Sequence, residues 1–108
     1  MPRVDLLKGT LNMLILRCLE LEARHAMAIA DRIERVTHGT FLVRPGSLFP
    51  ALQRLERDGF VQGTWSSSGG RRVRSYALTA SGHLQLDREL AQWASLVLAV
   101  TQALGDEN

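Results

Sequence analysis

The sequence is short of cysteine, of net charge and of long apolar runs. Its one cysteine, Cys18, excludes an internal disulfide and a cysteine-built metal site, and it suits a reducing compartment. Because Cys18 lies between Ile15 and Leu21, we interpret it as a small core residue. Lys8 and Arg17 interrupt the first apolar stretch, which is well short of the ~18 apolar residues of a membrane span. We therefore expect a cytoplasmic protein without a membrane partner.

The charge balance is slight, and its distribution is more informative than its size. The 108 residues carry 13 basic and 11 acidic side chains, a net charge of +2. An apolar fraction of 45% and a charged fraction of 22% are ordinary for a globular domain. No acidic residue lies between Asp58 and Asp87, a stretch that contains Arg71, Arg72 and Arg74. Such a local basic cluster is typical either of a nucleic-acid contact or of a solvated loop.

No catalytic or metal-binding motif is found. The 3 histidines, His25, His38 and His83, lie in separate segments and lack the spacing of metal ligands. The pair Gly69-Gly70 lacks the strand-to-helix setting of a phosphate-binding loop. We therefore expect neither an enzyme nor a protein with a cofactor or metal.

Hydrophobic periodicity predicts helices over about 6–21, 25–36 and 47–58, with Gly46 or Ser47 as the cap of the third. The residue types in segments 60–65 and 72–78 predict that these are two strands, joined by a flexible tip at 66–70. Thr79 is expected to cap a last helix that ends near 104. The expected core faces are Leu7, Leu11, Leu14, Cys18 and Leu21, then Ala26, Ile29, Ala30, Ile33 and Val36, then Leu48, Leu52 and Leu55.

The last helix carries an apolar seam of the kind through which helices pair. Its members are spaced four and three residues apart and are Leu86, Leu90, Trp93, Val97, Val100 and Leu104. The seam could instead pack on the first helix of the same chain, but it is long for so small a core. Leu96 and Leu98 add apolar surface beside it. We therefore predict a homodimer formed through this helix.

The predicted architecture is mainly α with a β-hairpin: a winged helix-turn-helix plus a C-terminal dimerisation helix. Residues 1–79 would form the DNA-binding unit and residues 80–108 the dimerisation helix, in one compact domain.

The outward side of the third helix is polar, basic and partly aromatic, which suits double-stranded DNA. A helix fits the major groove, and arginine matches both guanine acceptors and phosphate oxygens. The alternative is a winged-helix module that binds only proteins. A protein-binding face, however, should expose more apolar area than the outward side of the third helix does. The candidate DNA-binding residues are Ser47, Phe49, Gln53, Arg54, Arg57, Arg71, Arg72 and Arg74.

Three stretches resemble the PadR family of bacterial transcriptional regulators, in the family's order. Residues 6–11 (LLKGTL) are similar to the family's opening. Residues 46–52 (GSLFPAL) with 55–59 (LERDG) resemble its recognition helix. Residues 71–82 (RRVRSYALTASG) resemble its wing and the entry to the last helix.

The resemblance implies a dimeric repressor. It also places Trp93 where some members bind a planar aromatic effector between paired helices, although tryptophan is equally suited to anchor an interface. Three positions depart from the family's pattern. Phe49 replaces a usual tyrosine, Met27 follows His25-Ala26 where His-Gly-Tyr is common, and Ser75 replaces a frequent aromatic residue.

Overall fold

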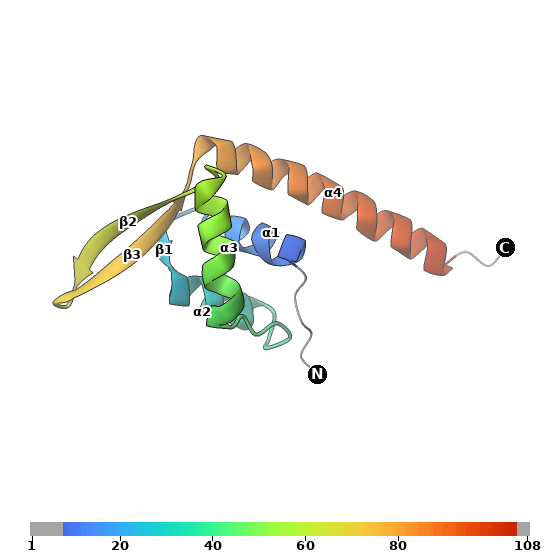
Figure 1. The fold of residues 1–108 in the computed structure, drawn as a ribbon. Coiled ribbons are helices and arrows are strands. Elements are labelled where there is room, and N and C mark those ends of the chain that lie inside the picture. Colours follow the sequence, from blue (N-terminus) through green and yellow to red (C-terminus); the bar gives the residue numbers. More distant parts are fainter. Residues whose placement is uncertain (1–7, 106–108) are drawn as a thin grey trace.

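Four helices and a small antiparallel sheet make up residues 8–105, the part of the chain that the computed structural model describes (Figure 1). The helices are α1 (Lys8–Cys18), α2 (Ala26–Val36), α3 (Pro45–Arg57) and α4 (Ala80–Gly105); the strands are β1 (Arg24–His25), β2 (Val61–Ser68) and β3 (Arg71–Leu78). This confirms the predicted winged-helix fold with a C-terminal helix. The predicted helix start at Leu6 and Leu7 lies outside the described residues.

Helix α1 lies at the centre of the core. It packs against α2, α3 and α4, and its sequence is apolar on more than one side. Ile15 and Leu16, adjacent in the chain, are both fully buried. A helix that is apolar around most of its circumference needs partners on several sides, and α1 has them.

Two of the expected core residues are not in the core. Leu21 is 91% exposed because α1 ends at Cys18, so the helical periodicity no longer applies at position 21. Val36, the last residue of α2, is half exposed. The prediction that these two residues are buried was wrong, whereas the expected faces of α2 before Val36 and of α3 are buried as predicted.

The sheet has the order β1-β3-β2. Strands β2 and β3 pair from Val61 opposite Leu78 to Ser68 opposite Arg71, so the turn is Gly69-Gly70 alone. Both glycines have positive φ, as a two-residue type I′ turn requires. The predicted tip at 66–70 was too long, because 66–68 belong to β2. Strand β1 was missed, since two residues give no alternation to recognise.

Helix α3 starts earlier than expected and ends where expected. It begins at Pro45, after Arg44 as N-cap, because proline fixes the φ angle suited to the first helical position. The predicted cap at Gly46 or Ser47 was therefore wrong. At the other end Gly59 has φ +80°, and the Phe60 N–H donates to the Leu55 carbonyl at 2.9 Å. This is the hydrogen bond of a Schellman C-cap.

The start of α4 is joined directly to the end of α3. The Thr79 hydroxyl accepts a hydrogen bond from the Gly82 N–H at 2.9 Å and donates one to the Gly59 carbonyl at 2.6 Å. Thr79 is thus the cap of α4, as predicted. A Cβ atom on Gly82 would lie 2.0 Å from the Phe60 carbonyl oxygen, so only glycine allows this close approach.

The substitution Gly82→Ala should therefore destabilise the fold by about 2–3 kcal/mol, because a backbone oxygen cannot move out of the way of the added methyl group. Urea unfolding at one fixed protein concentration measures this. Gly46→Ala is the matched control, since a Cβ there meets nothing within 4 Å. A Gly82→Ala protein as stable as the control would contradict this account of the junction.

Candidate nucleic-acid interface

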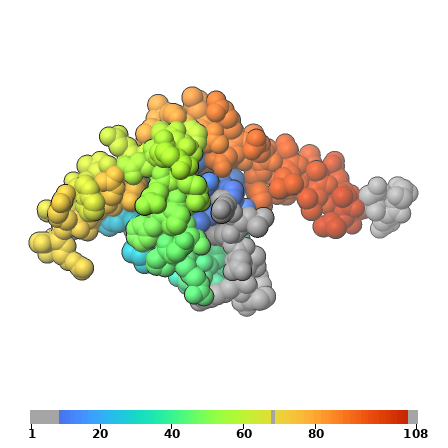
Figure 2. All heavy atoms as spheres, viewed as in Figure 1, coloured from blue at the N-terminus to red at the C-terminus, as the bar shows by residue number. Residues whose placement is uncertain are grey.

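Helix α3 and the hairpin β2–β3 form one continuous surface of the molecule. The hairpin projects from the end of α3 that leads into β2 (Figure 1), and Figure 2 shows both elements exposed next to each other. Helix α2 packs behind them against α3 and β3. A helix and an adjoining hairpin arranged in this way make the reading surface of a winged helix-turn-helix.

The two faces of α3 separate core from candidate contact residues. Leu48, Ala51, Leu52 and Leu55 are buried. Of the residues predicted to bind DNA, Arg54 is half-buried and four are exposed: Ser47, Phe49, Gln53 and Arg57. Arg57 also lies 3.6 Å from the Asp58 carboxylate, in an exposed ion pair. The structure therefore brings the predicted residues of α3 to one outer side of the helix.

The hairpin carries a stacked cluster of cations and rings. Trp65 lies opposite Arg74 in the strand pairing, so the two side chains share a face. The Arg72 and Arg74 guanidinium carbons lie 4.8 and 5.3 Å from the centroid of the Trp65 ring. These distances are within the range of cation–π attraction, which holds the indole and both arginines in place.

Arg74 is tied to α3. Its Nη2 donates to Glu56 Oε2 at 2.5 Å, and the Gly63 N–H donates to the same oxygen at 3.2 Å. A Cβ on Gly63 would lie 2.5 Å from Arg74 Nε, so the glycine leaves room for the guanidinium. Arg71 and Arg72, in contrast, form no ion pair with any side chain that the structure describes. The charge of Arg74 is thus paired within the chain, whereas the charges of Arg71 and Arg72 are not paired with a carboxylate of the described residues.

A cavity of about 460 Å³ lies between the start of α2, α3 and the hairpin. Met27, Phe49 and Trp65 line it and are 44–54% exposed, and Arg71 and Arg72 lie at its side. Of the three apolar residues, only Phe49 was among the predicted contact residues. Met27 and Trp65 were missed because neither belongs to α3, although the strand alternation was a usable signal for Trp65.

The apolar seam of α4 divides at Leu86. Leu86 is fully buried in the chain's own core, so it has no surface left for a partner. The rest of the seam is 36–83% exposed: Leu90, Trp93, Val97, Val100 and Leu104. Trp93 also lines a cavity of about 290 Å³ between α1 and α4, together with Glu89. Burial raises the pKa of the Glu89 carboxyl, and its hydrogen bond with Gln85 partly lowers it.

Residues 15–88 match the sequence profile of the transcriptional regulator PadR-like family. The chain belongs to this family. A PadR family transcriptional regulator from Eggerthella lenta is 29% identical, with a TM-score of 0.81 over 93% of this chain and 86% of that one. A PadR-like regulator from Bacillus cereus is 25% identical, with a TM-score of 0.79 over 93% and 96%. Uncharacterized protein X of Lysinibacillus sphaericus is 29% identical over 98 residues, 89% of each chain.

Membership of the PadR-like family makes the chain a transcriptional regulator and confirms the predicted family. None of the helices within residues 8–105 has the length and apolar character needed to span a bilayer. Within the same residues, no group of histidine, cysteine and acidic side chains is arranged to hold a metal ion.

If the Arg74–Glu56 pair fixes the wing, then Glu56→Ala should loosen β2 and lower stability by about 1 kcal/mol, because the pair is only half-buried. Amide hydrogen exchange should show the Gly63 N–H becoming less protected. Asp58→Ala, which removes the exposed pair with Arg57, is the control and should leave β2 unchanged. Equal protection of Gly63 in both variants would argue against this role of Arg74.

Proposed function

We propose that this PadR-like regulator is a sequence-specific repressor that binds a palindromic operator as a homodimer. The proposal rests on one observation: the exposed face of α3 lies on the same surface of the molecule as Arg71 and Arg72 of the hairpin, which form no ion pair with a described side chain. No acidic side chain lies between Asp58 and Asp87 to oppose them. A basic helix next to a basic hairpin offers both the shape and the charge that duplex DNA requires.

The proposed contacts follow from what each element can reach. Ser47, Phe49, Gln53 and Arg54 on α3 would meet base edges or the adjacent phosphates in the major groove. Arg57, Arg71 and Arg72 would neutralise phosphates. Arg74 would act indirectly, through its bond to Glu56, by holding the wing at a fixed distance from α3. Two such surfaces in a dimer would meet half-sites about one helical turn, ~10 base pairs, apart.

The exposed apolar lining of the α2–α3–hairpin cavity favours a second candidate function, a winged-helix module that binds a protein. Met27, Phe49 and Trp65 together expose apolar surface that a protein partner could cover. The same side chains also suit DNA, because thymine presents a methyl group in the major groove. Competition by unrelated DNA separates the two functions.

The dimer is proposed from the exposed part of the α4 seam. From Leu90 to Leu104 the apolar side chains recur at helical spacing along a face that the described residues leave 36–83% exposed. A second copy offers the same seam, so the two faces would be complementary by symmetry. Trp93 would lie within this interface, where the cavity between α1 and α4 also leaves room for a planar aromatic effector.

Binding to the DNA upstream of the chain's own gene should be saturable and should survive an excess of unrelated DNA in a mobility-shift titration. If the dimer neutralises roughly six phosphates, affinity should fall on the order of a thousandfold between about 50 and 200 mM salt. Arg72→Ala should weaken binding to all sequences alike, whereas Arg88→Ala, on α4, should not. Retardation lost at once to unrelated DNA would instead favour the protein-binding function.

Val97→Glu should convert the dimer to a monomer and abolish operator binding at the same concentration, because it buries a charge among apolar side chains. Light scattering coupled to size-exclusion chromatography measures the mass directly. Gln102→Glu, on the other side of α4, adds the same charge outside the seam and should leave the dimer intact. A dimeric Val97→Glu protein would show that α4 is not the interface.

A further inference from the structure

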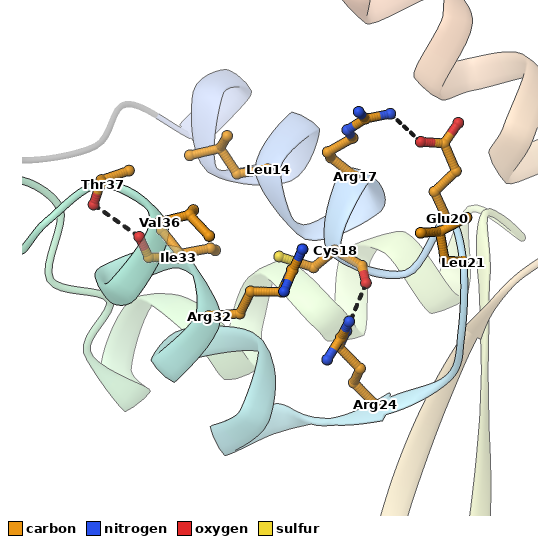
Figure 3. A pocket seen from close by; sticks show the side chains of 10 residues that line it. All are labelled: Leu14, Arg17, Cys18, Glu20, Leu21, Arg24, Arg32, Ile33, Val36 and Thr37. Carbon is orange, nitrogen blue, oxygen red and sulfur yellow. Dashed lines mark hydrogen bonds and ion pairs between the residues drawn. The ribbon is translucent and has the colours of Figure 1, made fainter.

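A third cavity lies away from the wing, between the end of α1 and the outer side of α2 (Figure 3). It has a volume of about 360 Å³. This is within the ~300–1,000 Å³ typical of sites for small organic molecules. Neither the DNA contacts nor the proposed dimer seam uses any of its lining residues. We call it the α1–α2 cavity.

The apolar part of the α1–α2 cavity continues the hydrophobic core. Leu14, Cys18 and Ile33 line it from α1 and α2, and Ile33 is almost fully buried. Leu21 and Val36 lie at its edge. These two are the residues that the sequence pattern assigned to the core and that the structure leaves exposed. Apolar side chains on both sides of an open cavity leave a surface that an apolar molecule would cover.

The charged side chains that line the α1–α2 cavity are mostly arginines, and one of them, Arg32, has no ion-pair partner among the described residues. Arg17 pairs with Glu20. Arg24 donates through Nε to the Cys18 carbonyl at 2.8 Å, at the end of α1, and pairs with Glu22 at 3.1 Å. Arg32 has no carboxylate within ion-pair distance among the described residues, although it is half-buried.

Arg32 points into the α1–α2 cavity. Figure 3 shows its guanidinium next to Cys18. Burial raises the pKa of the Cys18 thiol, and the positive charges of Arg32 and Arg24 partly lower it. Because Arg32 pairs with no carboxylate of the described residues, an anion bound in the cavity would balance its charge.

We propose that the α1–α2 cavity binds a small organic anion, an apolar ring system that carries one carboxylate. The carboxylate would pair with Arg32, whose planar guanidinium matches both of its oxygens. The ring would lie against Leu14, Ile33 and Val36. The site is independent of the proposed DNA contacts and of the dimer.

The test uses 2-naphthoate as the probe and the full chain without DNA, with methyl groups of isoleucine, leucine and valine followed by NMR. The methyl signals of Leu14, Ile33 and Val36 should shift saturably as the probe is added. Arg32→Gln should weaken binding about tenfold, because it removes a charge-assisted hydrogen bond. Arg35→Gln, the same change on an exposed position of α2, should leave the affinity within about twofold of the original.

The neutral amide of the probe tests the charge without any substitution, so the result does not depend on whether Arg32→Gln folds. 2-Naphthamide should bind about tenfold more weakly than 2-naphthoate. Equal affinity for the acid and the amide would overturn the proposal. So would shifts confined to residues around Trp93, or no saturation in the accessible range of probe concentration.

Discussion

The junction between the end of α3 and the start of α4 determines where every functional element lies. The Thr79 hydroxyl bonds both helices, since it donates to the Gly59 carbonyl and accepts from the Gly82 N–H. The Thr79 N–H donates to the Phe60 carbonyl at 3.1 Å, which closes the base of the hairpin. Because Gly82 has no Cβ, the first turn of α4 sits directly on that carbonyl. Helix α3, the hairpin and α4 therefore meet at one junction.

The outer part of the wing needs a further attachment, because β1 pairs only with Ser75 and Tyr76 of β3 and a two-stranded hairpin alone is marginally stable in water. Arg74 supplies it halfway along β3, where it bonds Glu56 of α3 and lies over Trp65 and Tyr76. Both partners keep about a third of their side-chain surface in solvent, so the pair costs less to desolvate than a fully buried one. The result is a division of labour among the hairpin arginines. Arg74 is paired with α3, whereas Arg71 and Arg72 form no ion pair with any described side chain.

Local signals predicted the elements of the fold, whereas the use of each side chain depended on tertiary contacts. Gly59 and Thr79 were recognisable because caps are defined by a few neighbouring residues. The turn at Gly69-Gly70, had it been taken as two residues, would have paired Trp65 with Arg74. No local pattern shows that Glu56 forms an ion pair with Arg74, or that Leu86 is buried in the chain's own core. Both facts depend on how elements distant in the sequence pack together.

In the proposed dimer, the long helix α4 would connect its apolar seam to the surface formed by α3 and the hairpin. Of its 26 residues only Gly82 and Leu86 are buried, so the rest of residues 8–105 leaves most of the helix surface uncovered. Most of the stability of a helix in a protein comes from the packing of its apolar face, and an exposed apolar face adds a cost. In the proposed dimer, pairing would stabilise this part of α4 and cover the seam at once. Because the junction fixes α4 to α3, the register of the seam would then set the distance between the two recognition helices.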